Sequence, residues 1–224
     1  MKVGTILRET LRTWLGAFLL AFLLPVGLLS TPCLGQEAER EAHDVPGAYS
    51  LTAGMSLEQV QEIAGELQQL NPFTYVADSL PGSHGELETF AMVITPEEGL
   101  CRLQATSAVI VDGGDGTVVR EKFDRLFEVL WGTHGKHQVV STLLADSAYQ
   151  APHEWMTALL EKEQVLMTLW TLDDGSKLSG GLESIVLSAR ALKPTEGFLN
   201  IDYTFSNWPG CQGRLESAPP VADG

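Results

Sequence analysis

Apolar residues recur with a helical period directly after Ser56, at positions Leu57, Val60, Ile63, Ala64 and Leu67. Ser56 and Gln59 have the spacing of a capping box, in which each side chain accepts a hydrogen bond from the other residue's backbone N–H. Asn71-Pro72 then provides a stop signal. The pattern predicts a helix that begins after Ser56 and ends before Pro72, with one apolar face.

The same period predicts two more helices. The first spans residues 117–131 with Gly132 as its C-terminal cap, and its apolar stripe consists of Val119, Phe123, Leu126, Phe127 and Leu130. The second opens with Pro152, a residue suited to a first helical turn. It presents Trp155, Leu159 and Leu160 to a core.

Six segments rich in β-branched and aromatic residues predict strands. They are residues 73–78, 87–95, 100–106, 165–172, 182–192 and 198–205. In the last segment, Leu199, Ile201, Tyr203 and Phe205 alternate with polar residues, which predicts a sheet with one buried face and one wet face. The expected fold class is therefore α+β, an antiparallel sheet with about three helices packed on one face.

A weak internal repeat connects two of these strand pairs. Residues 86–89 (ELET) before the turn 96–100 (PEEGL) resemble residues 181–184 (GLES) before 194–198 (PTEGF). In both turns proline restrains φ at the first corner and glycine supplies freedom at the exit. Such turns are common, so chance similarity and duplication both stay open. Duplication would give two tandem helix-plus-three-strand units, residues 54–111 and 112–206.

Residues 1–35 have the order of a secretory signal peptide. A basic head with Lys2, Arg8 and Arg12 precedes an apolar run over residues 14–30, and small residues lead to a cleavage position after Gly35. We expect a periplasmic or secreted protein. The alternative is that residues 14–30 remain as a membrane anchor.

Composition narrows the choice of partners. The chain has 224 residues, a formal net charge of −15 and 44% hydrophobic residues. The apolar fraction supports a packed core, whereas the acidic balance argues against nucleic acid, which requires clustered Lys and Arg. Residues 36–53 are polar and lack periodicity, so they predict a flexible leader, and residues 207–224 predict a loose tail pinned near its beginning by Cys211.

Cys101 and Cys211 are the two cysteines that remain after cleavage, because Cys33 lies in the signal segment. In an oxidising compartment two cysteines indicate one disulfide. Two buried free thiols are the alternative.

The glycine-rich residues 112–117 (DGGDGT) lie between a strand and a helix, where a phosphate-binding loop would lie. The spacing lacks a third glycine and a Gly-Lys-Ser/Thr motif, and two aspartates would repel a phosphate. Asp112 and Asp115 fit calcium better, although Gly114 occupies the position between the usual ligands. We interpret this segment as a structural turn.

Histidines offer a second candidate chemistry. His134 and His137 are three residues apart, and His153 precedes a glutamate, but Thr157 stands where a zinc-protease helix needs its second histidine. Ser83-His84 lacks a nucleophile elbow. We therefore expect no catalytic residue, no metal site and no cofactor.

Among the tryptophans, Trp131, Trp155 and Trp170 have apolar neighbours that are typical of a core. Trp208 lies beside Pro209 and near Cys211, and it is the candidate for an exposed contact with a partner.

Two resemblances add to this interpretation. Residues 54–60 (GMSLEQV), which open a helix ahead of strands, resemble the start of the small lipoprotein subunit of the outer-membrane β-barrel assembly machine. The tandem helix-plus-sheet units are similar to those of the β-lactamase inhibitory protein. Both resemblances imply a scaffold that engages other proteins.

A longer resemblance runs from Gly99 to Cys211. Residues 99–102 (GLCR), 131–136 (WGTHGK), 154–156 (EWM) and 203–207 (YTFSN), together with Cys211, are similar to a group of exported bacterial proteins with no assigned activity. This similarity strengthens the pairing of Cys101 with Cys211 and supplies no catalytic residue.

The sequence therefore predicts an exported, non-enzymatic α+β protein that binds another envelope or secreted protein and meets a membrane only through an uncleaved signal segment. Two alternatives remain. One is a metal-binding protein or hydrolase that uses His134, His137 and His153, and the other is an inhibitor of a secreted hydrolase.

Overall fold

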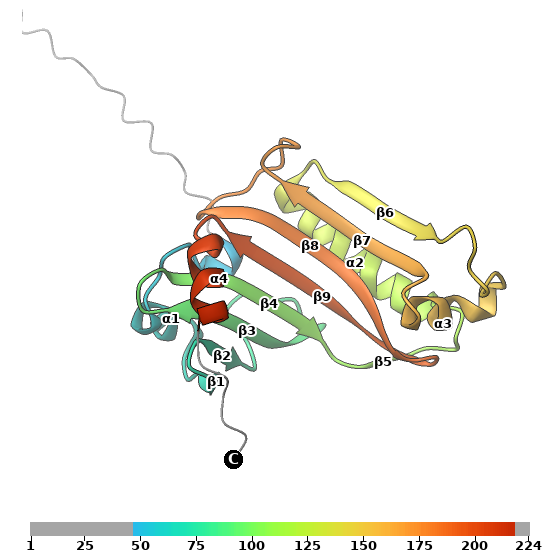
Figure 1. The fold of residues 1–224 in the computed structure, drawn as a ribbon, viewed down its shortest axis with the longest axis horizontal. Coiled ribbons are helices and arrows are strands. Elements are labelled where there is room, and N and C mark those ends of the chain that lie inside the picture. Colours follow the sequence, from blue (N-terminus) through green and yellow to red (C-terminus); the bar gives the residue numbers. More distant parts are fainter. Residues whose placement is uncertain (1–46, 218–224) are drawn as a thin grey trace, which may run out of the picture. The chain divides into compact units, whose positions relative to one another are not determined.

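A nine-stranded antiparallel sheet with helices on both of its faces forms the described part of the chain, residues 47–217 of the computed structural model (Figure 1). The expected signal peptide, the larger part of the expected leader and the end of the tail lie outside the described residues. The fold class is α+β, as the sequence predicts.

The helices are α1 (Leu57–Ala64), α2 (Thr117–His134), α3 (Trp155–Leu160) and α4 (Trp208–Ser217), with short 3₁₀ turns η1 (Ala48–Ser50) and η2 (Pro152–Glu154). The strands are β1 (Gln68–Asn71), β2 (Thr74–Ala77), β3 (Leu87–Thr95), β4 (Gly99–Ser107), β5 (Ile110–Val111), β6 (Gln138–Leu143), β7 (Gln164–Thr171), β8 (Leu182–Lys193) and β9 (Glu196–Phe205). They are ordered β1-β2-β3-β4-β9-β8-β7-β6 across the sheet, and β5 pairs with β9.

The predicted capping box starts α1. The backbone N–H of Ser56 donates to Gln59 Oε1 at 2.9 Å, and the backbone N–H of Gln59 donates to Ser56 Oγ at 3.4 Å. The helix ends at Gly65, where φ is 78°, well before Pro72. The missing length is β1, a strand too polar and too exposed to be recognised from alternation.

The core lies between the sheet and α2, on the face to which alternate strand residues point. Two rows of facing residues cross the central strands from β3 to β7: Phe90, Ala105, Ile201, Leu187 and Thr168 in one, and Met92, Leu103, Tyr203, Ile185 and Trp170 in the other. All ten are buried. The predicted alternation in β9 is confirmed, because this period-two pattern brings its apolar residues into both rows.

Each half of the sheet consists of a helix followed by four antiparallel strands, one strand more than the predicted units. The two similar stretches noticed in the sequence begin β3 and β8 and form the turns into β4 and β9. These hairpins meet at the β4–β9 pair, where Gln104 lies opposite Asp202 and each residue stands at the same distance from its turn glycine, Gly99 or Gly197. The internal similarity therefore corresponds to an approximate two-fold arrangement of the strands.

The second half carries two additions. Helix α2 has 18 residues where α1 has 8, although both end at a glycine with positive φ, Gly135 at 71° and Gly65 at 78°. The chain between β6 and β7 contains η2 and α3, whereas a tight turn joins β1 to β2. β6 is also the longer of the two outer strands, with six residues against four in β1.

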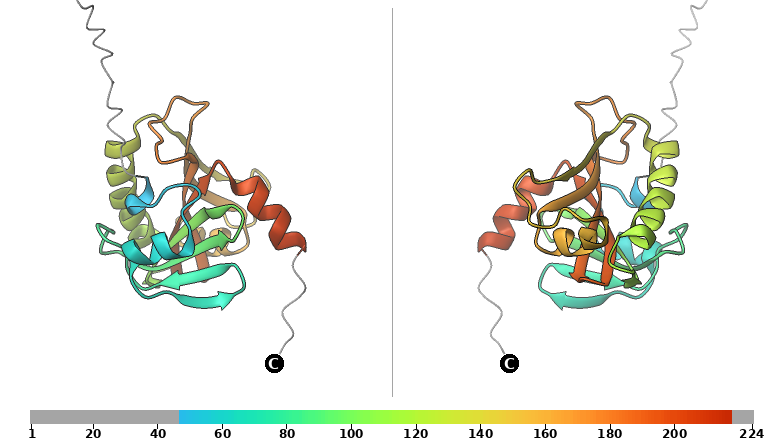
Figure 2. Two further views of the ribbon diagram at one scale, coloured as in Figure 1. Left: turned by 90° about the vertical axis from the view of Figure 1, so that its left-hand side faces the viewer. Right: turned by 90° about the vertical axis from the view of Figure 1, so that its right-hand side faces the viewer.

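Two expectations need correction. Residues 47–53 do not behave as a flexible leader, because Leu51 is fully buried in the core. The tail after Asn207 is not loose through residue 217, since it forms α4 with Cys211 buried beneath it. A fourth helix that the sequence did not predict, α4, lies on the side of the sheet opposite to α2 (Figure 2).

Candidate functional site

The loop before α2 is a structural cap and not an anion site. Asp112 is buried, and its carboxylate accepts backbone N–H groups from Gly114 and Gly116 at 2.8 Å and from Val118 at 2.9 Å. These are the donors that would bind a phosphate at a helix N-terminus. Because the chain's own carboxylate already occupies them, the interpretation as a structural turn agrees with the geometry.

The candidate histidines do not converge. The ring of His137 bonds the Gly135 carbonyl at 3.0 Å, and the ring of His134 bonds the Lys177 carbonyl at 3.0 Å. His84 Nδ1 accepts the backbone N–H of Glu86 at 3.3 Å, which makes Ser83-His84 part of a turn. Within residues 47–217, no three His, Cys, Asp or Glu side chains are grouped to hold a metal ion.

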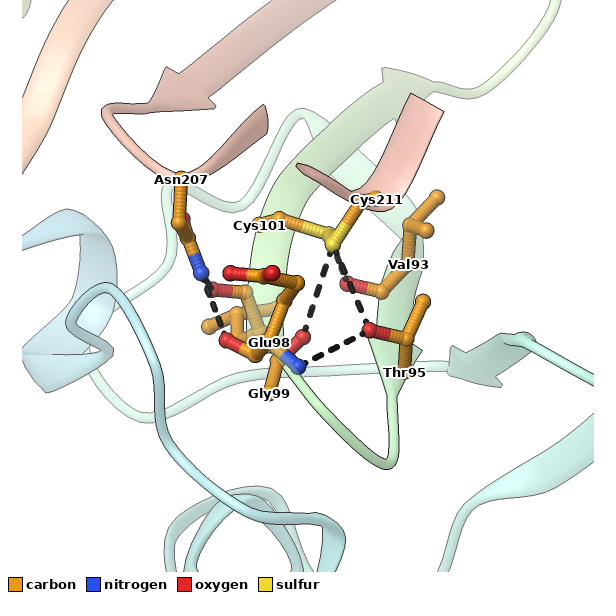
Figure 3. Close-up of a disulfide and its surroundings, with 8 residues drawn as sticks. Val93, Thr95, Glu98, Gly99, Cys101, Asn207 and Cys211 are labelled. Atoms are coloured by element: carbon orange, nitrogen blue, oxygen red, sulfur yellow. Dashed lines mark hydrogen bonds between the residues drawn. A yellow bond between two sulfur atoms is a disulfide. The ribbon is translucent and has the colours of Figure 1, made fainter. Parts of the chain in front are cut away.

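The predicted disulfide joins Cys101 on β4 to Cys211 on α4 (Figure 3). A register shift between β3 and β4 next to Cys101 lets this side chain leave the core and meet the helix on the opposite face. Asn207, at the start of α4, donates through Nδ2 to the carbonyls of Glu98 at 2.6 Å and Leu100 at 3.0 Å. The bond and these contacts fasten α4 over the β3–β4 turn.

The tryptophans only partly follow their predicted roles. Trp170 is fully buried, but Trp131 is 49% exposed near the end of α2, so its prediction as a core residue is wrong. Phe127 stacks on Trp131 with a ring separation of 6.2 Å. Trp208 is half-buried and lies under the guanidinium of Arg102, 5.1 Å from its ring centroid.

A cavity of about 570 Å³ lies on the α2 side of the sheet. Its base is formed by Ile201 and Tyr203 of β9, one wall by α2, another by the loop of residues 81–85, and its rim by residues 47–50. Glu86 fastens the loop to α2, because its carboxylate accepts from Arg125 at 2.7 Å and from Lys122 at 3.4 Å. No local sequence pattern marks this cavity, since its residues come from four segments that are distant along the chain.

Two tyrosines meet at the cavity wall. The hydroxyl of Tyr203 donates to the hydroxyl of Tyr49 at 3.2 Å, and their rings make an edge contact at 5.7 Å. Burial raises the pKa of both phenols, so both are neutral at physiological pH. Tyr49 and Ser50 have φ of 55° and 66°, a conformation that costs a non-glycine residue of order 1–3 kcal/mol. The surrounding contacts hold Tyr49 in this strained position.

His134 lines the same cavity and is locked to the β7–β8 loop. Its ring bonds the Lys177 carbonyl, and the backbone N–H of Lys177 donates to the His134 carbonyl at 2.9 Å. Burial lowers the pKa of His134, so the ring is neutral at pH 7. A carbonyl needs a donor, which places the proton on Nδ1 and leaves Nε2 as an acceptor.

The outer strand β6 is the second feature that the sequence analysis missed. Its first five residues are exposed, and its last residue, Leu143, is half-buried. The side chains of Val139 and Val140 are 55% and 39% exposed. Its inner side pairs with β7 along its whole length, and in the part of the chain that the structure describes no strand pairs with its outer side. β6 does not alternate between apolar and polar residues as a half-buried strand does, so the sequence did not predict it as a strand.

Comparison with protein-family models, curated proteins and solved structures finds no match to this chain. None of the helices within residues 47–217 is both long and apolar enough to cross a membrane. The fold and the two surface features therefore carry the functional argument by themselves.

Proposed function

We propose that this chain is an exported, non-enzymatic binding protein that takes an extended segment of another envelope or secreted protein alongside β6. The single observation that carries the proposal is the outer side of β6, with which no strand of residues 47–217 pairs. β6 has six residues, exposed valines and no charged side chain. Natural proteins normally protect such an edge with charges, proline or a covering element, because its free N–H and C=O groups pair readily with another strand.

The opposite edge of the sheet makes the contrast clear. β1 has four residues and runs directly into Asn71-Pro72, so it offers a short edge next to a proline. β6 is longer and has no proline. Since the two strands occupy equivalent places in the two halves, the difference favours β6 as the edge that receives a partner.

Side chains next to β6 favour an apolar segment. On the sheet face opposite α2, Val140 lies beside Met167, and Leu169 lies beside Val186 on the next strand. All four side chains are partly or largely exposed. A strand added to β6 would place every second residue on the same sheet face as Val140. Apolar residues at these alternate positions would therefore extend the apolar surface of Val140, Met167, Leu169 and Val186.

Charge and compartment define the partner further. The chain has a formal net charge of −15, and the edge of β6 has no acidic side chain. A neutral or basic segment would therefore approach more readily than an acidic one. The Cys101–Cys211 disulfide supports an oxidising compartment, in agreement with the signal-like residues 1–35. The non-enzymatic part of the proposal is supported by His84, His134 and His137, each of which bonds a backbone group through Nδ1.

Site-specific photo-crosslinking in the native host tests the proposal. A photoreactive amino acid replaces Val140 on β6 or, as the matched control, the exposed Leu70 on the opposite edge. We expect a crosslinked band with one discrete partner from position 140 and none from position 70. With the photoreactive residue at position 139 instead, Val140→Lys should abolish the crosslink to the partner, because an edge lysine opposes strand addition. Leu70→Lys, on the opposite edge, should leave this crosslink unchanged.

Three results would count against the proposal: no product from position 140, equal products from both edges, or a product with the mass of two copies of this chain. A partner that proves to be a secreted hydrolase would support the proposal and make the protein its inhibitor.

A further inference from the structure

We infer that the cavity between α2, β9 and the loop of residues 81–85 binds an uncharged, largely apolar small molecule that carries an oxygen able to accept a hydrogen bond. The site is independent of the β6 edge, with which it shares no residue. A volume of about 570 Å³ is within the range of about 300–1,000 Å³ that is usual for small-molecule sites.

The composition of the lining disfavours ionic ligands. None of the 17 lining residues that the structure describes is Asp, Glu, Lys or Arg, in a chain whose sequence contains 29 acidic and 14 basic residues. The two phenols and His134 are neutral for the reasons given above. A bound carboxylate, phosphate or ammonium would therefore lose its hydration without gaining an opposite charge.

The apolar lining provides room for the body of such a molecule. Leu126 and Leu130 of α2 face the cavity, together with Ile201 of β9 and Leu87 of β3. These four residues belong to the buried core or border it, so the cavity is continuous with apolar surface that a ligand can cover. Burial of apolar surface supplies the main driving force for such binding.

The polar groups of the lining define the orienting contact. Tyr203 donates to the Tyr49 oxygen, so the proton of the Tyr49 hydroxyl is free to be donated to a ligand oxygen. On α2, His134 offers the acceptor Nε2, because Nδ1 donates to the Lys177 carbonyl. Tyr49 is held in a left-handed backbone conformation with its ring against Phe90 at 5.5 Å. Strain of this kind at a cavity wall is typical of a residue fixed in place for binding.

Three fluorescent probes test the inference on the full chain. N-phenyl-1-naphthylamine is uncharged, 8-anilino-1-naphthalenesulfonate has the same rings with an added sulfonate, and prodan is uncharged and carries a ketone. We expect N-phenyl-1-naphthylamine to bind at least about tenfold more tightly than the sulfonate, because no Lys or Arg is among the described residues that line the cavity. Equal affinity for both probes, or no binding of the uncharged probe, would overturn the inference.

Variants locate the binding. Val129 lines the cavity and Val118 does not, and both are exposed on α2. Val129→Trp should weaken the binding of N-phenyl-1-naphthylamine by about tenfold or more, while Val118→Trp should change it less than about twofold, because only the first fills the cavity mouth. Equal effects of the two variants would place the probe elsewhere and overturn the inference.

Tyr49→Phe tests the orienting contact, with Tyr75→Phe as its control. We expect loss of the Tyr49 hydroxyl to weaken prodan by about fivefold and to leave N-phenyl-1-naphthylamine within about twofold, because only prodan carries a ketone acceptor. Melting temperatures of all variants are measured alongside. If Tyr49→Phe weakened both probes alike in a folded protein, the assignment of the hydroxyl as the ligand's donor would be wrong.

Discussion

The carboxylate of Asp112 caps α2 from outside the helix, because its Oδ2 accepts the backbone N–H of Val118 at 2.9 Å. Its Oδ1 accepts two more N–H groups from the preceding loop, those of Gly114 and Gly116, both at 2.8 Å. A carboxylate at this place also interacts favourably with the positive end of the helix dipole. One buried side chain thus satisfies donors of the helix and of the loop that leads into it.

Replacement of Asp112 should therefore destabilise the fold. We expect Asp112→Ala to lower the free energy of unfolding by about 3 kcal/mol, because the variant leaves several buried N–H groups without an acceptor. Denaturation by urea measures this loss. Asp115→Ala is the control, since Asp115 is half-exposed and interacts with Thr117 next to it in the loop, whose N–H it accepts at 3.0 Å. A loss as large for Asp115→Ala as for Asp112→Ala would contradict the assigned role.

Gly99 should be equally sensitive for a steric reason. It begins β4 with φ of 65°, and a Cβ atom there would lie 2.3 Å from the Gly54 carbonyl oxygen and 2.7 Å from that of Met55. These neighbours are backbone atoms and cannot rotate away. We expect Gly99→Ala to cost about 3 kcal/mol or more, combining the strained φ with the clash.

The control for Gly99 is Gly85. A Cβ atom at Gly85 would meet nothing within 4 Å, and its φ lies outside the left-handed region. Gly85→Ala should therefore leave the melting temperature within about 2 °C of the parent, whereas Gly99→Ala should lower it by about 8 °C or more. Similar melting temperatures for the two variants would show that Gly99 does not lie so close to the Gly54 and Met55 carbonyls in solution.

The sequence was sufficient to predict those elements whose own residues show the hydrophobic period or the capping residues of a strand or helix. β3 was predicted with its observed limits, and the capping box of α1 was confirmed, because in both places burial and hydrogen bonding are encoded locally. β1, β6 and α4 were missed. The first two are exposed edge strands with little alternation, and α4 contains a proline and two glycines, so the disulfide and Asn207 stabilise it from outside.

The candidate site was harder to predict for a related reason. Tyr49 and Tyr203 form a hydrogen bond across 154 positions of the chain, and no local spacing marks them as neighbours. Tyr49 also lies in a segment whose composition predicted a flexible leader. The one signal in the sequence was the alternation in β9, which correctly turned Tyr203 toward the core.

The buried ring of His134 should make stability depend on pH. Burial lowers its pKa below the ordinary value, so the unfolded chain binds a proton at a higher pH than the folded chain does. The contribution of the neutral His134 ring to the free energy of unfolding is therefore fully present above the unfolded pKa of about 6.5. It is lost as the pH falls from there through the lowered pKa of the folded state.

Melting temperatures measured between pH 8 and pH 5 test this dependence, with endpoints on either side of the reference pKa of about 6.5. We expect His134→Gln to flatten the decline on the acid side, and the control is His153→Gln, a substitution of an exposed histidine. If both variants kept the slope of the parent, the acid sensitivity would arise from other groups.

The disulfide should stabilise the fold chiefly by restricting the unfolded chain. Cys101 and Cys211 are separated by 110 positions, and the chain-entropy model assigns about 4–5 kcal/mol to a loop of this length. The double variant Cys101→Ala/Cys211→Ala should thus unfold at clearly lower urea concentration than the parent. It should also become more sensitive to proteolysis within α4, because only the Asn207 hydrogen bonds and the exposed Arg214–Glu97 ion pair are then expected to hold the helix against the β3–β4 turn. Reduction of the parent with dithiothreitol should reproduce both effects and leave the double variant unchanged. If the reduced parent kept its urea midpoint, the bond would contribute little and α4 would be held by its packing instead.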